Sequence, residues 1–291
     1  MLFVYNRLNC TKRTLEALKK NELASKSELF IYSDGAKNKN DMKKVVKVRE
    51  YIKNIDGFKK ITIRKNKANT GLAQSIISGV TNVVNKYGKI IVLEDDLVTS
   101  RYFLRFMNEA LEAYKNEPKV ASIHGYIYPI KNLPETFFMK GADCWGWATW
   151  NNKWSIFERD GKKLLDKVKK KNIERKIDFN GYIKYTSMLK DQVEGKIDSW
   201  AIRWHVSAYL KNMITLYSGQ SYVQNIGFGK DATHTTTNLN LYKINLVKKF
   251  KFSKIPANED FVSQKKIENF FRSMKMSFIQ KIKLKIISYL K

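Results

Sequence analysis

Three consecutive carboxylates, Glu94-Asp95-Asp96, directly follow an apolar run at residues 90–93. Three of the four residues in that run are β-branched, which predicts a buried parallel strand with the carboxylates at its C-terminal end. Open α/β sheets bind ligands outside the carboxyl ends of their strands. Carboxylate oxygens suit Mg²⁺ or Mn²⁺, so the cluster predicts a place where a metal and a phosphate meet. The alternative is a solvated turn at the end of a strand.

The chain as a whole is strongly basic, with 55 Lys+Arg against 27 Asp+Glu and a formal net charge of +28. Such an excess favours an acidic partner: nucleic acid, anionic lipid or a phosphate-bearing small molecule. The lysines are dispersed, and no helix-turn-helix, RNP-like or zinc-finger pattern accompanies them. We therefore expect no nucleic acid as partner. A non-catalytic basic protein that binds nucleic acid or anionic membrane remains the alternative to an enzyme.

Chain length and cysteine content limit the class of protein to which this sequence can belong. With 291 residues, 43% of them hydrophobic, the chain can bury a sizeable core as one catalytic unit followed by a tail. Cys10 and Cys144 match neither a zinc spacing nor a disulfide framework, which favours a reducing cytosol. No signal-like segment opens the chain, and no apolar run approaches the length of a membrane span. We expect a cytoplasmic protein.

The elements that must position the carboxylates alternate between strands and helices, which predicts a doubly wound α/β sheet. A helix is expected to start at Thr11, which would serve as its cap. The second half of the chain is less regular. Strands are predicted at residues 2–5, 29–32, 61–63, 90–93 and 120–123, and helices at 11–20, 41–54, 71–87 and 100–114.

Four short motifs follow one another along the chain, and their order is informative. They are Tyr5-Asn6-Arg7, Tyr32-Ser33-Asp34-Gly35, Asn69-Thr70-Gly71-Leu72 and Leu93-Glu94-Asp95-Asp96. Together they resemble nucleotide-sugar-dependent glycosyltransferases of the GT-A fold, over about residues 1–235. The Glu-Asp-Asp form of the DXD motif is similar to the N-acetylglucosaminyltransferase I type and its bacterial family 2-like relatives. The resemblance implies an α/β, Rossmann-like, doubly wound mixed sheet in a single catalytic domain. Residues 1–120 would bind the nucleotide sugar, 121–245 would bind the acceptor and carry catalysis, and 246–291 would form a basic helical tail.

The resemblance also implies roles for single residues. Arg7 would bind phosphate or stack on the base, and Asp34 would accept a hydrogen bond from the base, as in uridine-binding relatives. Glu94 and Asp95 would contact the sugar and ribose of the donor, while Asp96 would ligate the Mn²⁺ or Mg²⁺ that bridges the diphosphate. From the residues alone, Arg7 could form a surface salt bridge and Asp34 an ordinary turn.

Four of the six tryptophans fall between residues 143 and 154. Aromatic rings stack on the apolar faces of sugars, and the resemblance, which includes a similar aromatic-glycine segment near donor and acceptor, implies that Trp145 and Trp147 line the donor site. Packing in the core is an equally good explanation from the sequence alone.

The segment Lys196-Ile197-Asp198-Ser199-Trp200 resembles the acidic-aromatic segment that supplies the catalytic base in inverting relatives. We expect Asp198 to take the proton of the acceptor hydroxyl. The segment has Ile197 where an aromatic residue is expected and Ser199 where a second acid is, so Glu194 is kept as the fallback. Alternatively, Asp198 caps the helix that follows.

Residues 225–234 look like the glycine-bearing loop that closes over the donor in this superfamily. His234 would then complete the metal shell and Lys230 would pair with the diphosphate; the alternative for His234 is a structural or surface role. Residues 261–291 carry eight basic residues against the single acid Glu268, with apolar residues at broadly helical spacing. This pattern favours a helix on anionic lipid, or else one packed on the domain or a partner subunit.

The resemblance thus implies a metal-dependent glycosyltransferase with a UDP-sugar as the favoured donor. We expect it to invert the configuration of the sugar; retention is the alternative, because the GT-A scaffold hosts both outcomes. The acceptor would be a glycan or lipid-linked glycan in bacterial surface polysaccharide assembly, reached from the inner face of the cell membrane.

Overall fold

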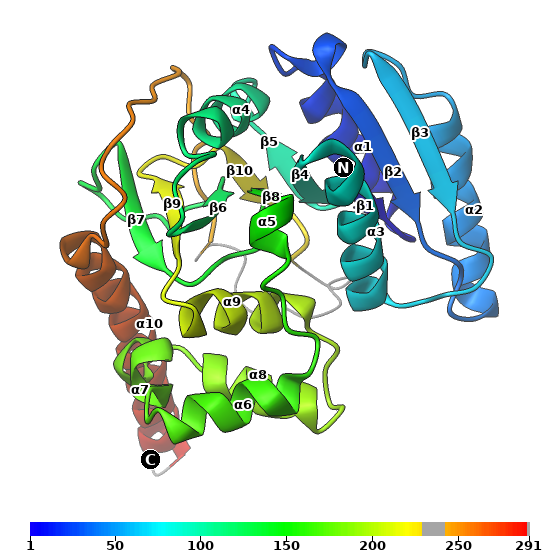
Figure 1. Cartoon of the computed structure of the whole chain (residues 1–291). Coiled ribbons are helices and arrows are strands. Elements are labelled where there is room, and N and C mark those ends of the chain that lie inside the picture. The colour runs from blue at the N-terminus through cyan, green and yellow to red at the C-terminus, as the bar shows by residue number, and fades with distance from the viewer. Residues whose placement is uncertain (229–241, 290–291) are drawn as a thin grey trace.

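One mixed sheet of eight strands, covered by helices on both faces, organises the chain (Figure 1). This computed structural model describes residues 1–228 and 242–289, without the side chains of 276–289. The strands lie in the spatial order β3-β2-β1-β4-β8-β6-β9-β7. The predicted class, α/β with a doubly wound mixed sheet, is confirmed.

The first half of the sheet is parallel, as expected for strands joined by helices. Asn38 caps α2 by accepting a hydrogen bond from the Asp41 amide at 3.0 Å. Gly88 ends α3 in the left-handed conformation, with φ 76°, which a glycine adopts without strain. The elements are β1 (Leu2–Val4), α1 (Leu8–Lys19), η1 (Ala24–Lys26), β2 (Glu28–Ser33), α2 (Lys39–Lys53), β3 (Lys60–Lys65), α3 (Leu72–Tyr87) and β4 (Lys89–Glu94).

The sheet continues into the second half of the chain through β8 (Trp147–Trp150), which lies antiparallel between β4 and β6 (Val120–His124). Beyond β6 come β9 (Ile214–Ser218), parallel to it, and the antiparallel edge strand β7 (Thr136–Lys140). No break in the sheet separates residues before 120 from those after.

Two apolar layers pack against the sheet. One contains α1, α2 and α4 (Phe103–Ala113), and the other contains α3 and α9 (Trp200–Leu210). A separate two-stranded ribbon pairs β5 (Leu97–Thr99) with β10 (Val223–Asn225). The remaining helices are α5 (Asn151–Trp154), α6 (Gly161–Lys170), α7 (Glu174–Ile177), η2 (Phe179–Gly181) and α8 (Tyr185–Val193).

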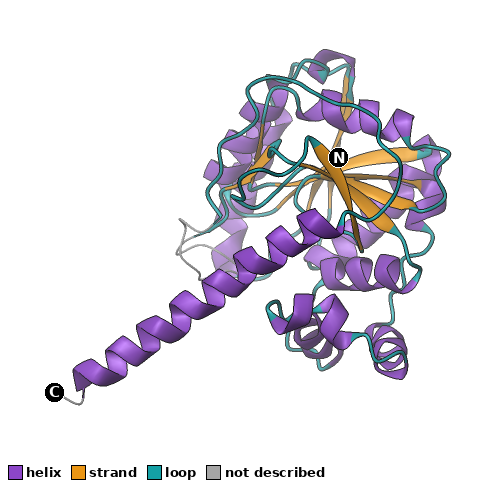
Figure 2. Ribbon diagram, turned by 90° about the vertical axis from the view of Figure 1, so that its left-hand side faces the viewer, coloured by secondary structure: helices purple, strands orange, loops and turns teal. Residues whose placement is uncertain are grey.

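The tail begins as part of the body. Val247 is buried, and the Tyr114 hydroxyl accepts a hydrogen bond from the Ile255 amide and donates one to the Ile255 carbonyl. Helix α10 (Phe261–Tyr289) follows, anchored through the buried Ile267, and its C-terminal part projects away from the body (Figure 2). Among the residues described, no helix combines the length and the apolar character that a membrane span requires.

The predicted elements of the first half are present, with ends shifted by a few residues. The predicted cap at Thr11 is wrong, because α1 starts earlier, at Leu8, and Thr11 lies inside the helix. There its hydroxyl donates to the Arg7 carbonyl at 2.9 Å, as a buried helical threonine commonly does.

Candidate functional site

A cavity opens where the winding of the sheet reverses. From β1 the chain moves to β2 and β3 on one side, then crosses to β4 on the other side of β1. This reversal is the place where open α/β sheets bind ligands. The cavity there has a volume of about 740 Å³ and is lined by residues 3–7, 94–95 and 196–198, with Asp34 among the other residues. Its size lies within the roughly 300–1,000 Å³ that is usual for small-molecule sites.

The predicted carboxylates lie at the end of β4, which terminates at Glu94 as expected. Arg7, three residues past β1, forms ion pairs with both aspartates: one amino group contacts Asp95, and the other lies 3.0 Å from Asp96 Oδ2. The Thr14 hydroxyl fixes the turn by donating to the Asp95 carbonyl at 2.9 Å. Arg7 is therefore an internal partner of the acidic cluster rather than part of a surface salt bridge.

Burial is the largest influence on the pKa values of the acidic cluster. Burial, and then the charges of Asp96 and Asp95, raise the pKa of Glu94. Burial also raises the pKa of Asp95, although the charge of Arg7 opposes the shift. For Arg7 itself burial favours the neutral form, but the two aspartates outweigh it and raise its pKa, so it stays cationic. One positive charge thus faces three carboxyl groups.

The donor set fits a divalent cation held together with phosphate. Asp95 Oδ2 is buried and finds no hydrogen-bond partner among residues 1–228 and 242–289, and the Asp96 side chain is only 14% exposed. Among the described residues, no three His, Cys, Asp or Glu side chains converge on one point. Mg²⁺ is commonly bound by one or two carboxylates plus substrate phosphates rather than by an all-protein cage. Asp95 and Asp96 match that arrangement.

Gly227 packs directly against Asp96 and Arg7 of the acidic cluster. The β5–β10 ribbon brings it there, and the Ile226 amide donates to the Asp96 carbonyl at 2.8 Å. A Cβ on Gly227 would lie 2.0 Å from Asp96 Oδ2 and 3.0 Å from Arg7 Nη1. A side chain at this position would therefore require Asp96 or Arg7 to move. Gly227 was expected in the glycine-bearing loop that closes over the donor, and its contact with Asp96 was not predicted. The one local indication of such a contact is a glycine shortly after a strand.

Asp34 lies in the cavity wall at the end of β2, and its carboxylate is already fully hydrogen-bonded. It accepts from the amides of Gly35, Thr70 and Gly71 at 2.9 to 3.1 Å, and from the side chains of Thr70 and Asn69 at 3.1 Å. These contacts fasten the loop before α3 to the end of β2. Contact with a base stays a prediction.

Two further groups support the cavity and were not predicted. Arg49 on α2 donates to the carbonyls of Asp34 and Asn66, at 3.1 and 2.7 Å. Asp41, in the first turn of the same helix, accepts from the Tyr5 hydroxyl at 3.0 Å and from the Asn6 amide at 2.8 Å. Helix α2 therefore positions both cavity-lining loops, and only spatial proximity reveals it.

Asp198 lines the cavity from the segment that precedes α9, and a Cβ on Gly71 would lie 3.5 Å from its Oδ2. Its side chain is 62% exposed, and Arg203 Nη2 lies 3.4 Å from Oδ1. The alternative that Asp198 caps α9 is wrong, because Ser199 is the cap and accepts from the Ile202 amide at 3.3 Å. Glu194, the fallback base, does not line this cavity, and it pairs with Lys196 at 2.6 Å. The geometry thus leaves Asp198 free for another role.

The two predicted sugar-binding tryptophans lie in different environments. Trp147 is fully buried, and its ring packs on Trp154, Trp200 and Trp204 at centroid distances of 5.1 to 5.9 Å within that group. This is the packing role that the sequence left open, and it gives a ligand no access. Trp145 is half-buried beside Phe228, at 5.9 Å between ring centroids. Lys230 and His234 lie outside the described residues.

Comparison with known proteins gives a partial likeness. No protein-family model matches the chain. No curated protein matches it either. Among solved structures, the chain is similar to mannosyltransferase PcManGT from Pyrobaculum calidifontis in complex with GDP-Man and Mn²⁺, with 13% identity, 44% of this chain and 34% of that one covered, and a TM-score of 0.31. It is also similar to S. aureus TarS 1-349, with 10% identity, 76% of this chain and 58% of that one covered, and a TM-score of 0.41. The chain thus spans about a third and somewhat over half of these two proteins, and no argument about activity rests on them.

Proposed function

We propose that this protein is a glycosyltransferase that moves a sugar from a nucleoside diphosphate sugar, a UDP-sugar in the favoured case, to a glycan acceptor. One observation carries the proposal. An acidic cluster paired with Arg7 lies at the reversal of a doubly wound sheet, where Arg7, Glu94 and Asp95 line a cavity of about 740 Å³ that also exposes Asp198. Carboxylates for a metal and a cation for a phosphate are the groups that a sugar diphosphate requires.

In the proposed reaction, the acceptor hydroxyl oxygen bonds to the anomeric carbon while the bond from that carbon to the diphosphate oxygen breaks. Asp198 takes the hydroxyl proton as in an inverting transfer, and its exposure in the cavity supports this role. Arg7 is placed to attract the diphosphate. A Mn²⁺ or Mg²⁺ ion held by Asp95 and Asp96 would stabilise the negative charge of the departing diphosphate. Glu94 would contact the donor sugar.

The test is release of nucleoside diphosphate from a panel of UDP-, GDP- and dTDP-sugars with Mn²⁺. We expect one nucleotide class to be consumed, and Asp96→Asn to lower the turnover at least about a hundredfold, as loss of a key electrostatic group does. The matched control is Asp191→Asn, which changes a solvent-exposed aspartate 3.6 Å from Lys196. Equal turnover in the Asp96 variant and the control, or no turnover of any donor, would refute the proposal.

We also propose that α10 holds the protein on anionic membrane, where a lipid-linked glycan of a bacterial surface polysaccharide would be the acceptor. The projection of α10 from the body and the basic residues of 261–291 support this (Figure 2). Substituting Lys281, Lys283 and Lys285 by Gln should weaken binding to phosphatidylserine vesicles. The matched control changes Lys169, Lys170 and Lys171 on and after α6. Equal weakening by both triple variants would reduce the effect to net charge and refute the anchor.

A further inference from the structure

A basic groove lies between α1 and β5, two elements that lead away from the acidic cluster. Helix α1 starts directly after Arg7, and β5 starts directly after Asp96. The groove has a volume of about 370 Å³, which is within the range usual for small-molecule sites. Its lining comes from α1 with its last residue and from β5 with the turn that follows: Arg13, Glu16, Ala17, Lys20, Val98, Thr99 and Arg101.

Hydrogen bonds hold the two walls of the groove together near both of its ends. Close to the cluster, the Thr14 hydroxyl of α1 donates to the Asp95 carbonyl at 2.9 Å. At the far end, Asn21 Nδ2 donates to the Thr99 hydroxyl at 3.0 Å. The groove is therefore formed before a ligand binds, and a preformed site avoids the entropic cost of ordering its walls.

Positive charge exceeds negative charge in the groove. Arg13, Lys20 and Arg101 are all exposed. Glu16 is the one acid among the lining residues, and its carboxylate accepts a hydrogen bond from the Tyr51 hydroxyl of α2 at 3.2 Å. Three cations against one carboxylate attract an anionic ligand.

The cations are spread along the groove rather than gathered around one point. Arg13 and Lys20 are seven residues apart, which is about 10 Å along the axis of a helix. Between them, Ala17 and Val98 are half-buried and give the groove an apolar surface. A ligand with several anionic groups along its length matches this arrangement better than a single anion does.

The other lining residues distinguish between classes of anionic polymer. None of the seven is aromatic, whereas proteins that bind single-stranded nucleic acid stack its bases on aromatic side chains. A flat lipid surface would contact the rims of a groove but not its apolar surface. A sugar chain enters a groove and has both hydroxyl groups and apolar ring faces.

We propose that this groove binds an anionic glycan, which carries phosphate or carboxylate groups along its chain, and that such a glycan is the acceptor. This role rests on the proposed function, since it names the acceptor of the same transfer. The cations attract the anionic groups, while Ala17 and Val98 contact the apolar faces of the sugar rings. Both walls lead back to the acidic cluster, so a chain bound in the groove has a high effective concentration near the donor.

The test measures binding of a fluorescein-labelled oligogalacturonate hexamer, which has a carboxylate on each sugar, by fluorescence polarisation at physiological salt without donor. We expect saturable binding. Replacing Arg13, Lys20 and Arg101 by Gln should weaken it about tenfold or more, since each of the three charges contributes a fraction of that factor.

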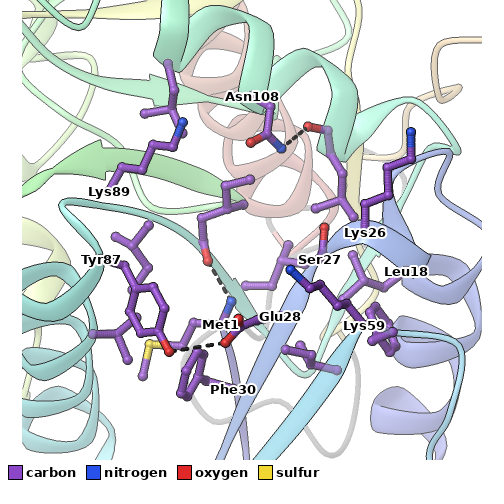
Figure 3. A pocket seen from close by; sticks show the side chains of 18 residues that line it. Met1, Leu18, Lys26, Ser27, Glu28, Phe30, Lys59, Tyr87, Lys89 and Asn108 are labelled. Atoms are coloured by element: carbon purple, nitrogen blue, oxygen red, sulfur yellow. Dashed lines mark hydrogen bonds between the residues drawn. The ribbon is translucent and has the colours of Figure 1, made fainter.

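The matched control removes the same number of charges at the opposite edge of the sheet. It carries Gln at three exposed lysines that line a second cavity near the amino ends of β2, β3 and β4 (Figure 3): Lys26, Lys59 and Lys89. This control should bind the oligogalacturonate as the parent does. Both triple variants should keep hydrolysis of the donor, because the substituted residues lie outside the cavity proposed for it.

A further variant makes the result independent of charge. Ala17→Met narrows the groove with an uncharged side chain that a helix accommodates well, so oligogalacturonate binding should fall while urea unfolding stays unchanged. Unchanged binding in this variant, or equal weakening in the two triple variants, would overturn the proposal. Equal binding of neutral maltohexaose, tighter binding of a hexanucleotide, or displacement by an equal concentration of inorganic phosphate would also overturn it.

The two proposals can fail separately. A protein that consumes a donor yet binds no oligogalacturonate would refute the groove and leave the proposed transfer in place. A protein that binds the oligogalacturonate yet consumes no donor would refute the transfer and, with it, the acceptor role of the groove.

Discussion

Replacing Asp34 by alanine tests whether the main role of this residue is to hold the loop before α3 against the end of β2. Its carboxylate accepts from the backbone amides of Gly35, Thr70 and Gly71, all within 3.1 Å. It also accepts from the side chain of Asn69 at 3.1 Å. Alanine would remove the acceptor that these donors share and leave them to water.

The cost follows from the number of donors and their access to water. A hydrogen bond to a charged group contributes about 1.5–3 kcal/mol, and water entering this part-buried loop recovers roughly half of that. Three backbone amides at about 1 kcal/mol each then give about 3 kcal/mol of lost stability. For a chain of this size, about 2 °C of unfolding temperature is lost per kcal/mol, so we expect a fall of about 6 °C.

The assay is thermal unfolding followed by circular dichroism, with donor binding measured on the same samples. Asp191→Ala is the control, since the Asp191 side chain is 40% exposed and its ion pair with Lys196 should contribute little. An Asp34→Ala protein that unfolds at the same temperature as the parent, yet loses donor binding, would refute this structural role. That result would assign the carboxylate to the base of the nucleotide.

Three other expectations follow from single contacts. Gly227→Ala should lower donor turnover about tenfold or more, because its Cβ would lie 2.0 Å from Asp96 Oδ2; unchanged turnover would mean that the segment yields without cost. The contribution of His124 to the unfolding free energy should fall as the pH drops below about 6.5, because burial lowers its pKa and the unfolded chain takes up the proton more readily. Urea titrations check this, and His124→Gln should flatten the pH dependence. Ser199→Ala should cost about 1 kcal/mol by removing the cap of α9, whereas Asp198→Ala should reduce turnover and leave urea unfolding unchanged; the reverse pattern would exchange their roles.

The first half of the fold could be predicted because local signals agree there. The apolar run of β4 and the glycine after α3 fix both elements without help from distant residues. The carboxylates at the end of β4 were predicted in the right place for the same reason. The start of α1 was not, because the helix begins directly after the turn at Arg7 and carries no side-chain cap.

The surroundings of the site depend on distant contacts and could not be predicted. Trp147 belongs to a strand inserted antiparallel between β4 and β6, and no local pattern shows which neighbours its ring meets. The partners of Asp34 come from a loop more than thirty positions away, as its contact with Thr70 shows. An acidic residue before a glycine is typical of a turn, and the sequence carries no sign of those distant donors.

The β5–β10 ribbon sets the order in which the site can be completed during synthesis. Strand β5 directly follows the acidic cluster and is made early, whereas its partner β10 leaves the ribosome only after the whole sheet has been translated. Domains begin to fold from their N-terminal part while the rest is being made. A nascent chain can thus assemble β1 to β4 with Arg7 beside its aspartates, while Gly227 is still absent. The contact of Gly227 with the acidic cluster is therefore one of the last to form while the protein is synthesised and folds.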